Sequence, residues 1–127
     1  MIRKEELRIG NLLGFQETDY VNICSIHSDD TIRHTINSKE YGCFRLNQYQ
    51  PILLTEEILL KCGFEQDVNI FISNDFVVFK NVHGVADGID KESFYCAYWK
   101  YAKHIKHLHQ LQNLYFALTG KELTYTP

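Results

Sequence analysis

The chain has 127 residues, of which 45% are hydrophobic and 13% aromatic, and this composition argues against a disordered protein. With 13 basic and 16 acidic residues, the formal net charge of −3 lacks the basic excess that attracts nucleic acid or anionic membranes, although a local basic patch is compatible with it. We expect a single compact domain over residues 1–127, which divides into a β subunit at 1–50 and an α+β subunit at 51–127.

Residues 1–10 are a short lead-in, and the rest of the N-terminal half predicts four short strands separated by turns. The expected strands are residues 11–16, 20–27, 31–37 and 41–46. The Asp, Asn and Ser residues between them favour turns, because their side chains bond to their own backbone. Short strands at this spacing predict a small, strongly bent antiparallel sheet or a partial barrel.

The C-terminal half predicts a helix followed by antiparallel strands. Thr55 is expected to cap a helix that begins with two glutamates and ends at Gly63, because a hydroxyl and nearby carboxylates favour a helix start. Residues 68–72 and 76–80 are then expected to form a hairpin, and 81–90 a loop.

Residues 94–108 fit two different structures. Apolar residues recur there at helical spacing, but the segment 94–98 is rich in aromatic residues, which favour strands. We therefore favour two short strands, about 94–98 and 103–107, joined by a turn near Lys100.

The last segment is the clearest helix signal in the sequence. Its apolar residues recur at the spacing of one helix face and are Leu108, Leu111, Leu114, Tyr115 and Leu118. Gln110, Gln112 and Asn113 are expected on the other faces, and Gly120 is expected to end the helix. A helix of about 11 residues is not stable alone in water, so its apolar face needs a partner surface. The predicted fold class is therefore α+β, with the C-terminal helix packed on the sheet.

Three segments of the chain resemble a known family. They are Arg8-Ile-Gly-Asn-Leu12, Pro51-Ile-Leu-Leu-Thr-Glu-Glu57 with Leu60-Lys-Cys-Gly-Phe64, and His109-Gln-Leu-Gln-Asn-Leu-Tyr-Phe-Ala-Leu-Thr-Gly-Lys-Glu-Leu123. The chain resembles a family of small uncharacterised proteins from gut bacteria and their phages or mobile elements, whose usual ending has Glu where this chain has Lys121. The resemblance implies a shared fold and suggests a phage or mobile-element origin. It implies no activity, because the family has no assigned one.

The segment from residue 98 to residue 109 is the main candidate for a binding site. Between Glu92 and Glu122 the chain has no acidic residue, and lysines alternate with aromatic residues. The candidate binding residues are Tyr98, Trp99, Lys100, Tyr101, Lys103 and Lys106. Exposed rings among them would anchor a protein partner. Lysines beside stacking rings are also typical of single-stranded nucleic-acid binding, and a structural interpretation places the lysines on a solvated sheet edge and the rings in the core.

The histidines and cysteines of the chain do not predict a metal site. No single regular element presents His104, His107 and His109 together, so we expect one of them to begin the last helix and the others to lie on the surface. The four cysteines form no C-x-x-C pair and sit in apolar segments, so we expect buried free thiols, although four cysteines also allow two disulfides.

No motif joins a nucleophile to a positioned base or forms a phosphate-binding loop, so we expect no catalytic residue and no cofactor. No signal peptide opens the chain, and no apolar run reaches the length of a membrane span, so we expect a cytoplasmic protein without membrane contact. The expected function is a non-enzymatic binding or accessory protein that acts through protein–protein contacts. The alternative is nucleic-acid binding through residues 98–109.

Overall fold

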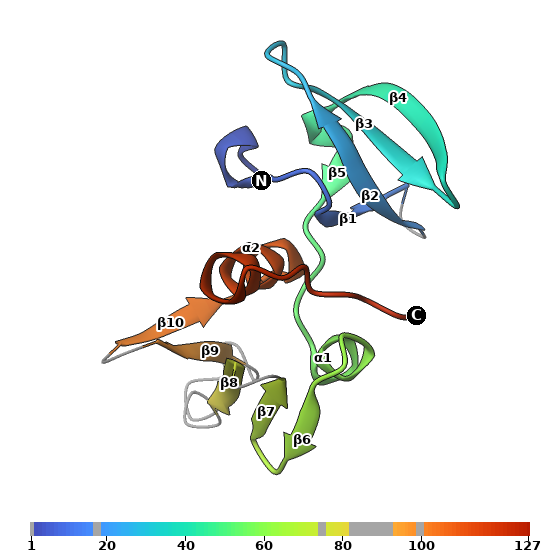
Figure 1. The fold of residues 1–127 in the computed structure, drawn as a ribbon. Coiled ribbons are helices and arrows are strands. Elements are labelled where there is room, and N and C mark those ends of the chain that lie inside the picture. The colour runs from blue at the N-terminus through green and yellow to red at the C-terminus, as the bar shows by residue number, and fades with distance from the viewer. Residues whose placement is uncertain (1, 17–18, 74–75, 82–92, 99–100) are drawn as a thin grey trace. The chain divides into compact units, whose positions relative to one another are not determined.

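The computed structural model describes residues 2–16, 19–73, 76–81, 93–98 and 101–127. Their contacts divide the chain into two compact units. Unit 1 comprises Met1–Ile52 and His107–Leu114, and unit 2 comprises Leu53–Lys106 and Tyr115–Pro127. Each unit contains one five-stranded antiparallel sheet (Figure 1). The expectation of a single domain stays a prediction.

Unit 1 contains the four strands expected from the sequence and one short strand that was not expected. They are β1 (Leu12–Phe15), β2 (Asp19–Ile26), β3 (Thr31–Ile36), β4 (Lys39–Arg45) and β5 (Tyr49–Gln50), in the order β4-β3-β2-β1-β5. Two 3-10 turns, η1 (Lys4–Glu6) and η2 (Leu46–Gln48), were not expected either. The barrel alternative is wrong, because β4 and β5 are edges and the sheet does not close.

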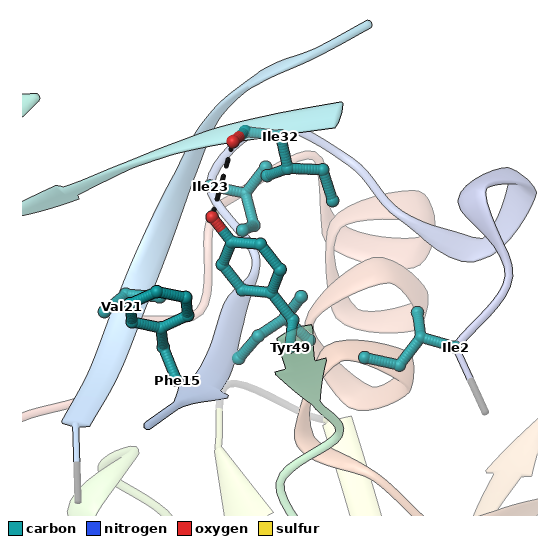
Figure 2. Close-up of a cluster of buried hydrophobic side chains, with 7 residues drawn as sticks. Ile2, Phe15, Val21, Ile23, Ile32 and Tyr49 are labelled. Carbon is teal, nitrogen blue, oxygen red and sulfur yellow. Dashed lines mark hydrogen bonds between the residues drawn. The ribbon is translucent and has the colours of Figure 1, made fainter. Parts of the chain in front are cut away.

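The core of unit 1 lies on one face of this sheet, because apolar residues alternate along β1 and β2. Its buried side chains, most of them labelled in Figure 2, are Ile2, Leu13, Phe15, Val21, Ile23, Ile32 and Tyr49. The hydroxyl of Tyr49 lies 3.4 Å from the carbonyl oxygen of Ile32, so the one polar atom of this ring has an acceptor inside the apolar cluster (Figure 2).

Unit 2 opens with helix α1 (Glu56–Lys61), which begins where the sequence predicts because the Thr55 hydroxyl accepts a hydrogen bond from the Ile58 amide over 3.2 Å. Its strands are β6 (Glu65–Asp67), β7 (Ile70–Ser73), β8 (Phe76–Asn81), β9 (Ser93–Tyr98) and β10 (Tyr101–Ile105), in the order β10-β9-β8-β7-β6. The expected β7–β8 hairpin is confirmed. Strand β6 was not expected.

The ambiguous segment after residue 93 forms the hairpin that we favoured. Strand β9 pairs antiparallel with β10, so the helical alternative is wrong. The second strand occupies residues 101–105 rather than 103–107, which makes the connection shorter than expected. Phe94 and Ile105 are opposite each other in this pair, and both are buried.

Helix α2 (Leu108–Thr119) packs on the sheet as predicted. Its ring Tyr115 lies 5.1 Å from Phe76 of β8, centroid to centroid. Leu108 and Leu111 are fully buried, and Gly120 has the positive φ of 73° that ends the helix. Leu118, expected on the buried face, is instead 38% exposed. None of the described helices is long and apolar enough to span a membrane.

Candidate functional site

The residues that the sequence singled out belong to the β9–β10 hairpin and its flanks. Trp99 and Lys100 lie outside the described residues. The other four are Tyr98 in β9, Tyr101 and Lys103 in β10, and the exposed Lys106 directly after it. Whether these residues bind a partner stays a prediction.

The same sheet has an apolar outer face that the sequence reading did not single out. Its inner face buries Phe71, Val78 and Cys96, which are neighbours across three strands. Because side chains alternate along strands, the intervening residues point to the opposite face. We call these apolar outward residues the outer patch: Ile70, Ile72, Val77, Phe79 and Tyr95.

The outer patch is continuous across strands β7, β8 and β9. Ile70 is opposite Phe79, and Phe79 is opposite Tyr95, in one row across the sheet. The rings of Phe79 and Tyr95 stack with centroids 5.6 Å apart, and the ring of His104 in β10 lies 5.1 Å from Tyr95. Ile70 and Ile72 are each 42% exposed. Large apolar side chains therefore form an ordered row that is exposed at Ile70 and half-buried at Phe79 and Tyr95.

Val68, at the turn between β6 and β7, adds a strained apolar residue beside this patch. It is 78% exposed and has a φ of +55°, which is the left-handed conformation that a β-branched side chain tolerates poorly. This conformation costs about 1–2 kcal/mol in an L-residue. The turn is held by hydrogen bonds from Gln66 Nε2 to the Val68 carbonyl, 3.0 Å, and from the Lys80 amide to the Asn69 carbonyl, 2.8 Å.

Polar and charged side chains border the outer patch on its two sides. On β6, Glu65 is opposite Ile72 and Asp67 is opposite Ile70, so both carboxylates share the outer face. Neither forms an ion pair with any residue that the structure describes. On the other edge, β10 carries the exposed His104, and Lys106 follows it. The patch is therefore bordered by carboxylates at its β6 edge and by an exposed histidine at its β10 edge.

A second polar arrangement, in unit 1, joins residues 6–12 to helix α2. The buried side chain of Asn11 donates to Asn113 Oδ1 over 2.8 Å, and the backbone amide of Leu12 donates to Gln112 Oε1 over 2.9 Å. Gln112 is only 3% exposed, so its expected place on an outward face of the helix is wrong. Each of these hydrogen bonds gives a buried polar group its partner. We therefore interpret the network as one that stabilises the fold.

His109 also departs from expectation, because it is fully buried rather than on the surface. Its Nε2 lies 3.0 Å from Glu6 Oε1. The carboxylate only accepts, so Nε2 carries the hydrogen and donates it. Burial raises the pKa of Glu6, but the hydrogen bonds and charge interactions with His109 and Arg3 together outweigh that effect and leave the pKa lowered.

The three histidines of residues 104–109 do not meet at one place. His107 and His109 stack on each other with centroids 5.7 Å apart, while His104 lies against Tyr95. Among the described residues, no group of three His, Cys, Asp or Glu side chains is arranged to hold a metal ion.

The cysteines are all free thiols, as expected, but only two are buried. Burial raises the pKa of Cys62 to about 12 and also raises that of Cys96, so neither thiol is a nucleophile at neutral pH. Cys43 is exposed and Cys24 half-buried, in contrast to the expectation of four buried thiols.

Two histidine pairs in unit 1 have the distances of acid–base partners. The Nδ1 atom of the buried His34 lies 2.7 Å from the hydroxyl of Tyr49, and burial, with the nearby thiols of Cys24 and Cys43, raises the pKa of that hydroxyl to about 12. This hydroxyl therefore stays protonated at neutral pH.

Ser25 Oγ lies 2.7 Å from His27 Nε2, the distance of a nucleophile from its base. Asp29, the acid that follows along the chain, accepts hydrogen bonds from the amide and hydroxyl of Thr31, and among the described residues it forms no hydrogen bond with the His27 ring. The pair therefore lacks the third group of a catalytic triad among the described residues.

Comparisons of the chain with protein-family models, with curated protein sequences and with solved structures find no match. The resemblance noted from residues 8–12, 51–64 and 109–123 stays a prediction.

Proposed function

We propose that this chain is a non-enzymatic binding or accessory protein that contacts a partner protein through the outer patch. The observation that carries the proposal is the alignment of five large apolar side chains on one sheet face, of which Ile70 and Ile72 are exposed and the other three are half-buried. Contiguous exposed apolar surface is a feature of interaction sites rather than of ordinary protein surface. A phage or mobile-element origin rests on the family resemblance alone.

The conformation of Val68 supports the same proposal. A glycine or asparagine at this turn would relieve the backbone strain and expose no apolar side chain. Strained residues persist where they serve a function or where the surroundings impose them. A strained valine that is 78% exposed is therefore more readily explained as a contact residue at the border of the outer patch.

The charges around the patch favour a protein partner over nucleic acid. Glu65 and Asp67 lie beside Ile70 and Ile72 on the same face, and carboxylates there repel a phosphate backbone. The alternative of nucleic-acid binding through residues 98–109 predicts affinity for single-stranded oligonucleotides that falls steeply with salt. A salt-dependent rise in fluorescence anisotropy that Lys106→Glu abolishes would favour that alternative.

A pair of matched substitutions tests the proposal. Ile72→Lys places a charge in the outer patch, and Leu60→Lys places the same charge at a similarly exposed position on α1, 47% against 42% exposed. In size fractionation of native-host extracts, the wild-type chain and Leu60→Lys should elute in an assembly larger than the chain alone. Ile72→Lys should elute as the free chain. Equal behaviour of the two variants would contradict the proposal.

A further inference from the structure

We infer that the outer patch binds a basic amphipathic segment of a partner protein, whose lysine or arginine side chains lie against Glu65 and Asp67 of β6. The inference rests on the proposed function, because it states the chemistry of the partner at the same surface. Three features of the sheet support it: the register between β6 and β7, the distribution of charge over the two faces of β6, and the direction of the lysine on β8.

The register between β6 and β7 places a carboxylate beside each exposed isoleucine of the patch. Asp67 is opposite Ile70, and Glu65 is opposite Ile72. Residues that are directly opposite each other on antiparallel strands have Cβ atoms about 5 Å apart. The two carboxylates are two residues apart on one strand, and their Cβ atoms are therefore about 7 Å apart. A segment that covers both isoleucines thus also reaches both carboxylates.

The negative charge of β6 lies only on the face that carries the patch. Glu65, Gln66 and Asp67 are all exposed, but Gln66 is opposite the buried Phe71 and points to the other face. Its side-chain amide donates to the Val68 carbonyl over 3.0 Å. Charges on an edge strand also discourage edge-to-edge pairing, but that role does not require both of them beside the patch. Their common face therefore makes the border of the binding surface negative.

The lysine on the central strand β8 does not neutralise this border. Lys80 is opposite the buried Phe94 and so points away from the patch, and its ammonium nitrogen lies 3.1 Å from Glu56 Oε1. In the part of the chain that the structure describes, neither Glu65 nor Asp67 has an ion-pair partner. Two carboxylates about 7 Å apart repel each other, so a cation placed beside both is favoured. A partner protein with lysine or arginine at this position supplies that cation.

The combination of apolar rows and carboxylates selects one kind of partner. An acidic protein surface or an anionic membrane would bring negative charge against Glu65 and Asp67. A segment that combines apolar and basic side chains buries Ile70 and Ile72 and places opposite charge at the border. Two exposed ion pairs strengthen such binding about tenfold, and salt weakens their contribution.

Two model peptides test the inference with the purified chain. One is a leucine–lysine peptide of about 14 residues with the leucines on one helix face, and the other has glutamate in place of each lysine. In fluorescence anisotropy at low salt the lysine peptide should bind the wild type. Glu65→Gln with Asp67→Gln should weaken that binding about tenfold and reduce its dependence on salt. The matched variant, Glu5→Gln with Glu57→Gln, removes the same charge at exposed positions outside this sheet and should bind as the wild type does.

Three results with the peptides would overturn the inference: no binding of the lysine peptide, equal binding of the two peptides, or equal binding by the wild type and the variant with Glu65→Gln and Asp67→Gln. In size fractionation of host extracts, the same double variant should elute more as free chain than the matched variant does. If it stays in the assembly while Ile72→Lys is released, the partner is not basic at this border. That result would overturn the inference and leave the proposed function standing.

Discussion

The side-chain oxygen of Gln112 accepts a hydrogen bond from the backbone amide of Leu12 over 2.9 Å, and the two residues are 100 positions apart in the chain. Both are buried. The amide of Leu12 is the first of strand β1. Helix α2 thus supplies, from one polar side chain, the acceptor that the first strand of unit 1 needs.

Replacing Gln112 with leucine should lower the free energy of unfolding by about 1–3 kcal/mol, because the Leu12 amide is left buried without an acceptor. Urea unfolding measures the loss. Gln50→Leu is the matched control at an exposed position and should change stability by less than about 0.5 kcal/mol. Equal losses of free energy of unfolding in the two variants would show that the hydrogen bond between Gln112 and Leu12 does not account for the effect at position 112.

Glu6 should make stability depend on acid pH. Although burial opposes ionisation, the interactions with His109 and Arg3 together leave the pKa of Glu6 below its ordinary value of 4.5. The unfolded state therefore takes up the proton more readily, so the stabilisation is present above pH 4.5 and is lost as the pH falls through the lowered pKa. Glu6→Gln should have a lower free energy of unfolding than the wild type near neutral pH. This difference between the two proteins should become smaller in acid. The exposed neighbour of Glu6 offers the control, Glu5→Gln, for which no such difference is expected.

His34 should add a second pH dependence in a higher range. Burial lowers the pKa of His34 below its ordinary value of 6.5, so the unfolded state binds a proton more readily and the folded state loses stability as the pH falls below that value. His34→Gln keeps a polar side chain but removes the titrating group, and should flatten this part of the stability curve. His104→Gln, at an exposed histidine, should leave the curve unchanged. Denaturant unfolding at a series of pH values would decide between these outcomes.

Val68→Asn should raise the free energy of unfolding by about 0.5–1 kcal/mol, because asparagine adopts the left-handed conformation at lower cost. The same substitution should weaken partner binding, because it removes an exposed apolar side chain. Val68→Thr keeps the β-branch and its strain, so its stability should match that of the wild type while its binding is also weakened. A loss of stability in Val68→Asn would refute the assignment of strain at this turn.

Most regular elements could be predicted from local signals, since the turn residues between β1 and β4, the apolar alternation of β2 and the 3.6-residue spacing of α2 are local properties of the sequence. Strands β5 and β6 could not, because they have two and three residues and no apolar alternation. They exist because a neighbouring strand provides hydrogen-bonding partners.

The polar network and the outer patch were missed for different reasons. Gln112 looks like a solvent-facing residue because its partner, Leu12, is remote in sequence. The segments around residues 8–12 and 109–123, which carried the family resemblance, nevertheless contact each other here. The signal for the outer patch was present in Ile70-Phe-Ile72, where apolar residues on both faces of a strand indicate that both faces are covered.

The central claim, that the outer patch is a protein-binding surface, is tested most directly by crosslinking in the host cell. A photoreactive amino acid placed at Ile72 should form a covalent adduct with one predominant protein, and the same group at Leu60 should not. Adducts of the same kind and yield from both positions, or none from position 72, would contradict the claim.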